Sequence, residues 1–203
     1  MDRIPVAAMS FTTPRLELRP LALPDAPAIQ RHFPHWEIVR FLNDRVPWPY
    51  PADGALVFIR DVALPAMERE EAFHWTLRLR ERPEEVIGVI SLMTEEDNNR
   101  GFWLGLPWQG RGLMEEACGP VTDVWFDALG HGVLRVPKAV ANRGSRRLSE
   151  RSGMRVVRTD VRAYVSGRHE SELWEITRAE WRAHRSAGQA ANRAANRAAG
   201  GGA

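Results

Sequence analysis

The sequence of 203 residues contains one cysteine and one lysine, and it has no apolar run long enough to cross a bilayer. The single cysteine, Cys118, excludes an internal disulfide framework and a cysteine-rich zinc site, and we expect it to be a small core residue. The six histidines are scattered without the spacing of metal ligands, so no metal is predicted. Because no stretch reaches about 18 apolar residues, no membrane-spanning helix and no membrane partner are predicted.

Positive charge is carried almost entirely by arginine, since Lys138 is the only lysine among 28 basic residues. The formal net charge of +2 permits an anionic ligand but does not require one. The first ten residues lack the long apolar segment of a signal peptide, which predicts a cytoplasmic protein. The oligomeric state is open, and a homodimer is possible.

Hydrophobic patterning predicts a single domain over residues 11–185, with a leader at 1–10 and a low-complexity, disordered tail at 186–203. The pattern indicates an α/β (α+β) fold, with a mixed, mostly antiparallel sheet of about seven strands and helices on both faces. The strands that flank the helix at 113–129 are expected to be its one parallel pair. Strands are expected at 15–20, 73–80, 85–93, 100–106, 133–140, 154–165 and 171–177, and helices at 24–33, 35–42, 53–70, 113–129 and 145–152.

A glycine-rich turn, Gln109-Gly110-Arg111-Gly112, separates an apolar strand from the start of the helix at 113–129. Amides in the first turn of a helix have no internal partners and carry the positive end of its dipole, so they can bind a pyrophosphate. A tight turn that binds nothing is the alternative. The segment lacks the lysine and the serine or threonine of a Walker A loop, and a glutamate replaces the third glycine of the dinucleotide fingerprint. A nucleoside triphosphatase and a Rossmann turn are therefore disfavoured.

The run Gln109-x-x-Gly112-x-Met114 resembles the pyrophosphate loop Q/R-x-x-G-x-G/A of the GNAT superfamily of N-acetyltransferases, and Met114 departs from it at the last position. A second match lies in VPKAVANRGSRRLSERSGMRVV, which resembles the family's strand, its N-x-x-S element and the following short helix. Further matches are to the branch that includes the ribosomal-protein alanine N-acetyltransferases: RLELRPLALPDA resembles its opening strand and helix, IGVISL its third strand and SELWEITRAEW its last strand. The resemblance covers about residues 11–185.

This resemblance implies a GNAT-like fold and an enzyme that moves the acetyl group of acetyl-CoA to a primary amine of a protein N-terminus or a small molecule. It implies that the pantetheine arm lies along the strand at 100–106 as an added strand, and that the glycine-rich turn holds the pyrophosphate. The residues that it assigns to the cosubstrate are Leu104, Gly105, Leu106, Gln109, Gly110, Arg111, Gly112, Leu113, Met114, Asn142 and Ser145.

The resemblance places Ser145 near the sulfur, which makes it the candidate general acid for the departing thiolate. Helix capping is the alternative role of this serine. The general base is left open among Glu95, Glu96, Asp97 and His74.

Two other classes of function compete with an enzyme. Met114 and the missing clear base motivate a non-catalytic acyl-CoA-binding regulatory module. Five arginines between residues 143 and 155 raise nucleic-acid binding, but Glu150 interrupts them and no aromatic stacking motif accompanies them. A solvated helix face, or a site for the 3'-phosphate of CoA, is favoured instead, and no nucleic-acid partner is predicted.

Overall fold

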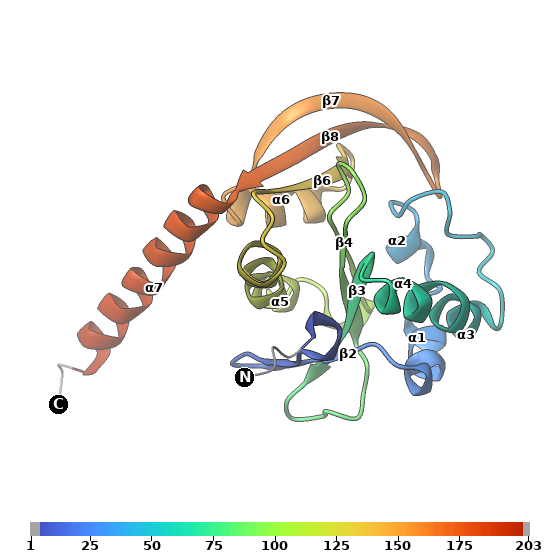
Figure 1. The fold of residues 1–203 in the computed structure, drawn as a ribbon, viewed down its shortest axis with the longest axis horizontal. Coiled ribbons are helices and arrows are strands. Elements are labelled where there is room, and N and C mark those ends of the chain that lie inside the picture. The colour runs from blue at the N-terminus through green and yellow to red at the C-terminus, as the bar shows by residue number, and fades with distance from the viewer. Residues whose placement is uncertain (1–4, 201–203) are drawn as a thin grey trace.

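The structure is a computed structural model that describes residues 5–200, and its strands form two antiparallel sheets (Figure 1). The larger sheet has five strands in the order β1-β2-β3-β4-β5, and the smaller has three in the order β6-β8-β7. Their bounds are Phe11–Thr12 (β1), Leu16–Pro20 (β2), Ala72–Leu79 (β3), Gly88–Met93 (β4), Arg100–Leu104 (β5), Val133–Ala139 (β6), Arg155–Tyr164 (β7) and Gly167–Thr177 (β8).

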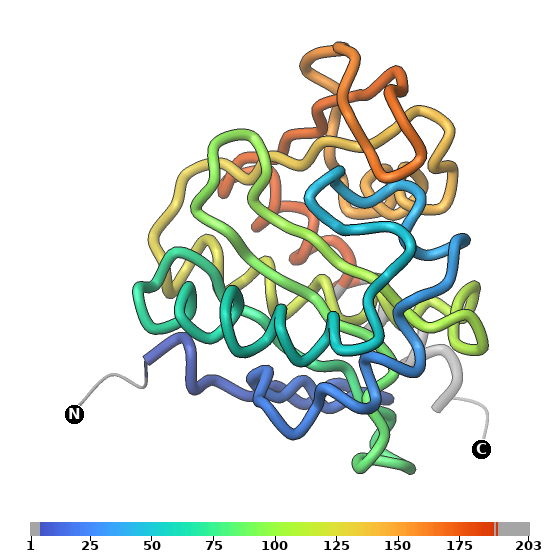
Figure 2. Tube along the Cα trace, turned by 90° about the vertical axis from the view of Figure 1, so that its right-hand side faces the viewer, coloured from blue at the N-terminus to red at the C-terminus, as the bar shows by residue number. Residues whose placement is uncertain are grey.

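Helices cover both faces of the larger sheet. One face carries α1 to α4, and the other carries α5 and α6 (Figure 1). Figure 2 shows the chain from α3 to α4 crossing one face while α5 lies behind the other. The bounds are Ala26–His32 (α1), Trp36–Val39 (α2), Gly54–Phe58 (α3), Leu64–Glu68 (α4), Leu113–Asp123 (α5), Arg143–Arg151 (α6) and Arg178–Gly200 (α7).

Each face of the larger sheet has its own hydrophobic core. Leu77 and Trp75 of β3 pack with apolar residues of α5 in one cluster, and Ile29 of α1 packs with Ile59 in the other. Cys118 is buried in the first cluster, which confirms the small core residue expected from the sequence. Because both faces are covered, every residue of β3 is buried, and its polar side chains need partners inside the protein.

The expected single sheet of about seven strands is wrong in one respect, since the structure divides its strands into sheets of five and three. In the described residues β5 pairs with β4 alone, and it forms no parallel ladder with β6. The two strands meet only near the turn before β5, where Asn99 N donates to Arg135 O at 2.7 Å and Arg135 N donates to Asn99 Oδ1 at 2.8 Å. Beyond this point the two strands belong to separate sheets, and residues of both line a cleft.

The helix after the glycine-rich turn continues through Pro120, where the sequence predicts a loosened or kinked helix. It widens to a π turn over Val124–Ala128. The missing amide of proline leaves one helical carbonyl without its usual donor, and buried packing holds the rest of the helix.

Within residues 5–200, parts of the expected leader and tail have regular structure. Residues 5–10 of the leader pack on the core, where Trp75 Nε1 donates to Met9 O at 2.8 Å, and residues 1–4 lie outside the described residues. Residues 186–200 of the predicted disordered tail continue helix α7, and 201–203 lie outside the description. Alanine and arginine favour helices, and Trp181 Nε1 anchors α7 to Asp123 of α5 at 2.7 Å. Within residues 5–200, no helix has the length and apolar character needed to cross a membrane.

A buried ion pair ties β3 to the helical side of the sheet, and it generates a test of stability. Arg78 Nη2 donates to Asp25 Oδ1 at 2.5 Å, and both side chains are at least nine-tenths buried. Asp25→Ala should lower the free energy of unfolding by about 3 kcal/mol, because it leaves a guanidinium buried without its carboxylate. Urea unfolding followed by circular dichroism measures the change. Asp61→Ala, which removes an exposed pair with Arg60, should leave the midpoint almost unchanged, and equal losses would contradict the argument.

Candidate functional site

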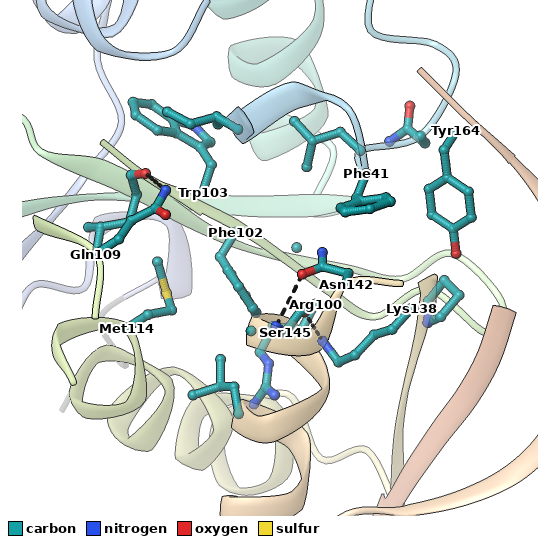
Figure 3. Close-up of a pocket in the computed structure, with 18 of the residues that line it drawn as sticks. Phe41, Arg100, Phe102, Trp103, Gln109, Met114, Lys138, Asn142, Ser145 and Tyr164 are labelled. Atoms are coloured by element: carbon teal, nitrogen blue, oxygen red, sulfur yellow. Dashed lines mark hydrogen bonds between the residues drawn. The ribbon is translucent and has the colours of Figure 1, made fainter. Parts of the chain in front are cut away.

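A cleft of about 870 Å³ opens where β5 and β6 diverge (Figure 3). The turn between β5 and α5 forms one end of the cleft, and the segment after α2, the β4–β5 turn and the end of β7 form the other. Residues that line it include Phe41, Glu95, Glu96, Arg100, Phe102, Leu104, Gln109, Gly110, Arg111, Gly112, Leu113, Met114, Lys138, Asn142, Ser145, Arg147, Arg151 and Tyr164.

Because glycine has no side chain, Gly110 and Gly112 of the glycine-rich turn line the cleft with main-chain atoms. Gly110 and Gly112 have φ angles of +73° and +74°, in the left-handed region that favours glycine. Gly112 is the N-cap of α5, and no side chain caps this end of the helix. The first-turn N–H groups, which include those of Leu113 and Met114, are therefore left for a ligand, and the helix dipole favours an anion there.

A brace of hydrogen bonds from the turn between β1 and β2 holds the glycine-rich turn in place. Glu116 Oε1 accepts hydrogen bonds from Thr13 Oγ1 and Arg15 N at 2.6 and 2.7 Å, and Oε2 accepts one from Arg15 Nε at 2.6 Å. Arg15 Nη1 then donates to the carbonyl of Arg111 at 2.9 Å. The carbonyl of Arg111 is thus held by Arg15, which fixes one peptide group of the turn.

All of the predicted cosubstrate residues line the cleft except Gly105 and Leu106. Gly105 N donates to Ile87 O at 2.8 Å, so its amide is already used within the sheet. Leu106 begins a 3-10 turn and is 38% exposed. Gln109 lines the cleft, but its side-chain amide donates to Leu104 O at 2.8 Å and closes the end of β5.

Ser145 lies in the first turn of α6 without serving as its cap. Asn142 is the N-cap, and its Oδ1 accepts a hydrogen bond from Ser145 N at 3.2 Å. The hydroxyl of Ser145 instead accepts a hydrogen bond from Lys138 Nζ at 2.7 Å (Figure 3). The structure therefore assigns the capping role to Asn142 and leaves the hydroxyl proton of Ser145 available in the cleft.

Lys138 is the cleft residue that sequence reasoning missed. It lies on β6 with 5% of its surface exposed, and its Nζ lies 5.1 Å from the centroid of the Phe102 ring. Burial, together with the nearby Arg100 guanidinium, lowers the pKa of Lys138 to about 7. The available signal was compositional, since the only lysine of the chain stands within the strand-like run VLRVPKAV.

The candidates for a general base separate into two groups. Glu95 and Glu96 line the cleft, and Glu95 also bonds to Arg45 at 3.1 Å. Asp97 does not line it and pairs with arginines of β6 and β7. His74 is buried on β3 beside Ser91, and burial lowers the pKa of His74 to about 4. The geometry brings only the two glutamates to the cleft.

Sequence reasoning also missed the aromatic residues at the far end of the cleft. Phe41 follows α2, and Tyr164 ends β7, with an isolated bridge between Asn43 and Tyr164 joining these distant segments. The Tyr164 hydroxyl lies 2.7 Å from Ser171 Oγ, and burial raises the pKa of Tyr164. No local motif connects residues so far apart in the chain.

The arginine-rich segment over residues 143–155 is largely engaged with carboxylates. Arg146 pairs with Glu172 at 2.7 Å, and Arg151 pairs with Glu115 at 3.1 Å. Arg147 and Arg151 line the cleft near the glycine-rich turn. Positive charge therefore lies beside the proposed anion site.

Solved structures that superpose on this chain include acetyltransferases. The ribosomal-protein-S5-alanine acetyltransferase from Vibrio fischeri superposes with a TM-score of 0.72 at 16% identity, over 85% of this chain and 98% of that one. A ribosomal L7/L12 alpha-N-protein acetyltransferase in complex with coenzyme A gives a TM-score of 0.70 at 17% identity, over 83% and 98%. Likeness at these identities shows the fold, and it confirms the predicted fold class.

The family model for the Acetyltransferase (GNAT) domain matches residues 15–155. The chain therefore belongs to the GNAT acetyltransferase family. YdaF of Bacillus subtilis (strain 168), whose assigned name is that of a ribosomal N-acetyltransferase, is 27% identical over 104 residues. That match covers 48% of this chain and 57% of the relative, so it spans little more than half of the relative's length. The names of these relatives agree with the branch that the sequence predicts.

The brace at Glu116 predicts a pH-dependent loss of stability. Burial raises the pKa of Glu116, but hydrogen bonds from Thr13 and Arg15 outweigh it, so the pKa is lowered overall. A carboxyl group whose pKa is lower in the folded state stabilises the fold at any pH above the ordinary carboxyl pKa. This contribution disappears as the pH falls below about 4. Glu116→Gln should therefore cost about 1 kcal/mol at neutral pH.

Urea unfolding of both proteins across the pH range measures this contribution. The free energies of unfolding of the wild type and Glu116→Gln should differ at pH 7 and converge in acid. A difference that stays constant with pH would show that the charge of Glu116 contributes nothing.

Proposed function

We propose that this protein transfers the acetyl group of acetyl-CoA to a primary amine of a protein N-terminus or a small molecule. One observation carries the proposal: a single cleft joins the uncapped amides of residues 110–114, the hydroxyl of Ser145 and the glutamates of the β4–β5 turn. Membership of the GNAT family supports acetyl-CoA as the donor. A homologous fold has been solved with coenzyme A, which agrees with this choice.

The cleft accommodates the donor in an extended form. The pyrophosphate would bind the amides from Gly110 to Met114, and the pantetheine arm would run along the outer edge of β5 at Leu104. β5 is the last strand of its sheet, so this edge is open to an added strand. Arg147 and Arg151 would attract the 3'-phosphate. Met114 is buried and lines the cleft, so its side chain would contact the donor.

The reaction needs a neutral amine, a polarised carbonyl and a proton for the departing sulfur. The amine nitrogen attacks the thioester carbon, the C–S bond breaks, and its electron pair remains on sulfur. Ser145 supplies the proton to the thiolate. Glu95 or Glu96, directly or through water, takes the proton that the amine loses.

The names of the relatives favour a protein N-terminus as the first acceptor to test, because they act on ribosomal proteins. The acceptor end of the cleft, with Phe41 and Tyr164, opens at the β4–β5 turn and the segment after α2. The cytoplasmic location, the homodimer and the expected absence of nucleic-acid, membrane and metal partners stay predictions.

Release of free thiol from acetyl-CoA, measured against a panel of N-terminal peptides and small amines, tests this proposal. At least one amine should be acetylated, and Ser145→Ala should lower kcat about 100-fold, the scale of a lost general acid. Ser149→Ala is the matched control, because Ser149 lies one turn further along α6 and its buried Oγ has no partner among the described residues. Tight binding of acetyl-CoA with no turnover of any amine would instead support the non-catalytic module.

The role of the glycine-rich turn can be tested by calorimetry with coenzyme A. Gly112→Ala should weaken binding about 10-fold or more, since a strained N-cap misplaces the amides that hold the pyrophosphate. Gly130→Ala is the matched control, with a φ of +79° outside the cleft. Both variants should lose stability, and only the first should lose affinity. Equal affinity in the two variants would contradict an anion site at this turn.

A further inference from the structure

The ammonium group of Lys138 is buried without a carboxylate partner. Its Nζ donates to Ser145 Oγ at 2.7 Å and lies over the Phe102 ring, and among the described residues no carboxylate lies within ion-pair distance of it. Buried lysines are rare unless they are paired, because transfer of a charge from water is costly. Packing alone does not account for an ammonium group that is buried without a carboxylate, next to the hydroxyl proposed to act on the substrate.

The charged and titratable groups around Lys138 come from four elements. Arg100 of β5 disfavours its positive charge, and Cys118 of α5 has a pKa raised by burial, so that group is a neutral thiol. Glu172 of β8 stands opposite Lys138 in the strand register, but both of its carboxylate oxygens bind Arg146 of α6, at 2.7 and 2.9 Å. The acceptor that remains for Lys138 is Ser145.

We propose that Lys138 is a positioning residue that orients the hydroxyl of Ser145 toward the departing thiolate and replaces the proton that Ser145 gives up. This inference rests on the proposed acetyl transfer and names a residue that acts through Ser145. An ammonium can only donate, so it occupies a lone pair of Oγ and leaves the hydroxyl proton to point into the cleft.

The proton balance of this step is complete. As the C–S bond breaks, Ser145 Oγ transfers its proton to sulfur and Lys138 Nζ transfers a proton to Oγ, which restores the hydroxyl. Lys138 is then neutral and recovers its proton from solvent, while the proton lost by the amine passes through Glu95 or Glu96 to solvent. Because a free thiol has a pKa near 8.5, transfer from an ammonium whose pKa is about 7 is downhill.

The kinetics of Lys138→Met, a variant of similar length without the charge, test whether Lys138 supplies a proton to Ser145. Only the charged ammonium can supply this proton, so kcat of the wild type should fall as the pH rises through the pKa of Lys138 in the complex. Lys138→Met should lower kcat at least 10-fold with the KM for acetyl-CoA nearly unchanged, and this alkaline fall should be absent. Lys138→Arg keeps a hydrogen-bond donor that does not release its proton. Its stability should therefore be close to that of the wild type, while its kcat should stay as low as that of Lys138→Met. Wild-type kcat with the same alkaline fall in Lys138→Met would overturn the proposal.

A measurement without turnover separates this inference from the proposed function. Since Lys138 is the only lysine, lysine labelled with carbon-13 at Cε gives a single NMR signal for it in the intact protein. The signal should titrate near pH 7 in the wild type and lower in Ser145→Ala, which loses the acceptor of the charged form. A midpoint near the ordinary lysine value of about 10.4 would overturn the role of Lys138, whatever the amine screen shows. Failure of every amine with a midpoint near 7 would refute the acetyl transfer, and with it the proton supply, while the buried contact between Lys138 and Ser145 would stand.

Discussion

Two hydrogen bonds between Asn99 and Arg135 join the sheets at one end, and the proposed chemistry lies where the strands separate beyond them. If β5 and β6 had continued as a paired ladder, the main-chain groups on the outer edge of β5 would be bonded to β6. That edge would then be closed to an added strand. The divergence exposes that edge and lets the first turn of α6 face the start of α5. The cleft therefore lies beyond the one place where the two sheets are joined by these hydrogen bonds.

The larger sheet supplies the rigidity that this opening requires. Its central strand is buried on both faces, and helices from opposite sides hold β4 and β5 in register. The brace from Arg15 and Glu116 extends this rigid part to the glycine-rich turn. Residues that would bind a cosubstrate are thus supported by the core instead of by a free loop, which reduces the entropy lost when a ligand binds.

Sequence reasoning succeeded where local conformation determines the outcome. The start of a helix at Leu113 and the turn at Gly110 and Gly112 follow from a short motif that sets its own backbone geometry, whereas the helix cap considered for Ser145 is Asn142 in the structure. The division into two sheets could not be predicted, because it depends on packing between strands that are far apart in the chain. For the same reason, the meeting of Lys138 with Ser145 and of Tyr164 with the segment after α2 has no signal in any short run of residues.

The scarcity of lysine has a consequence for a protein that would work beside an activated ester. Its one lysine side chain is buried, and every other residue counted among its Lys and Arg is an arginine. The guanidinium of arginine stays protonated and non-nucleophilic at neutral pH. Basic side chains on the outside therefore attract an anionic cosubstrate without competing for its acyl group. Such a surface resists spontaneous self-modification while it keeps its positive charge.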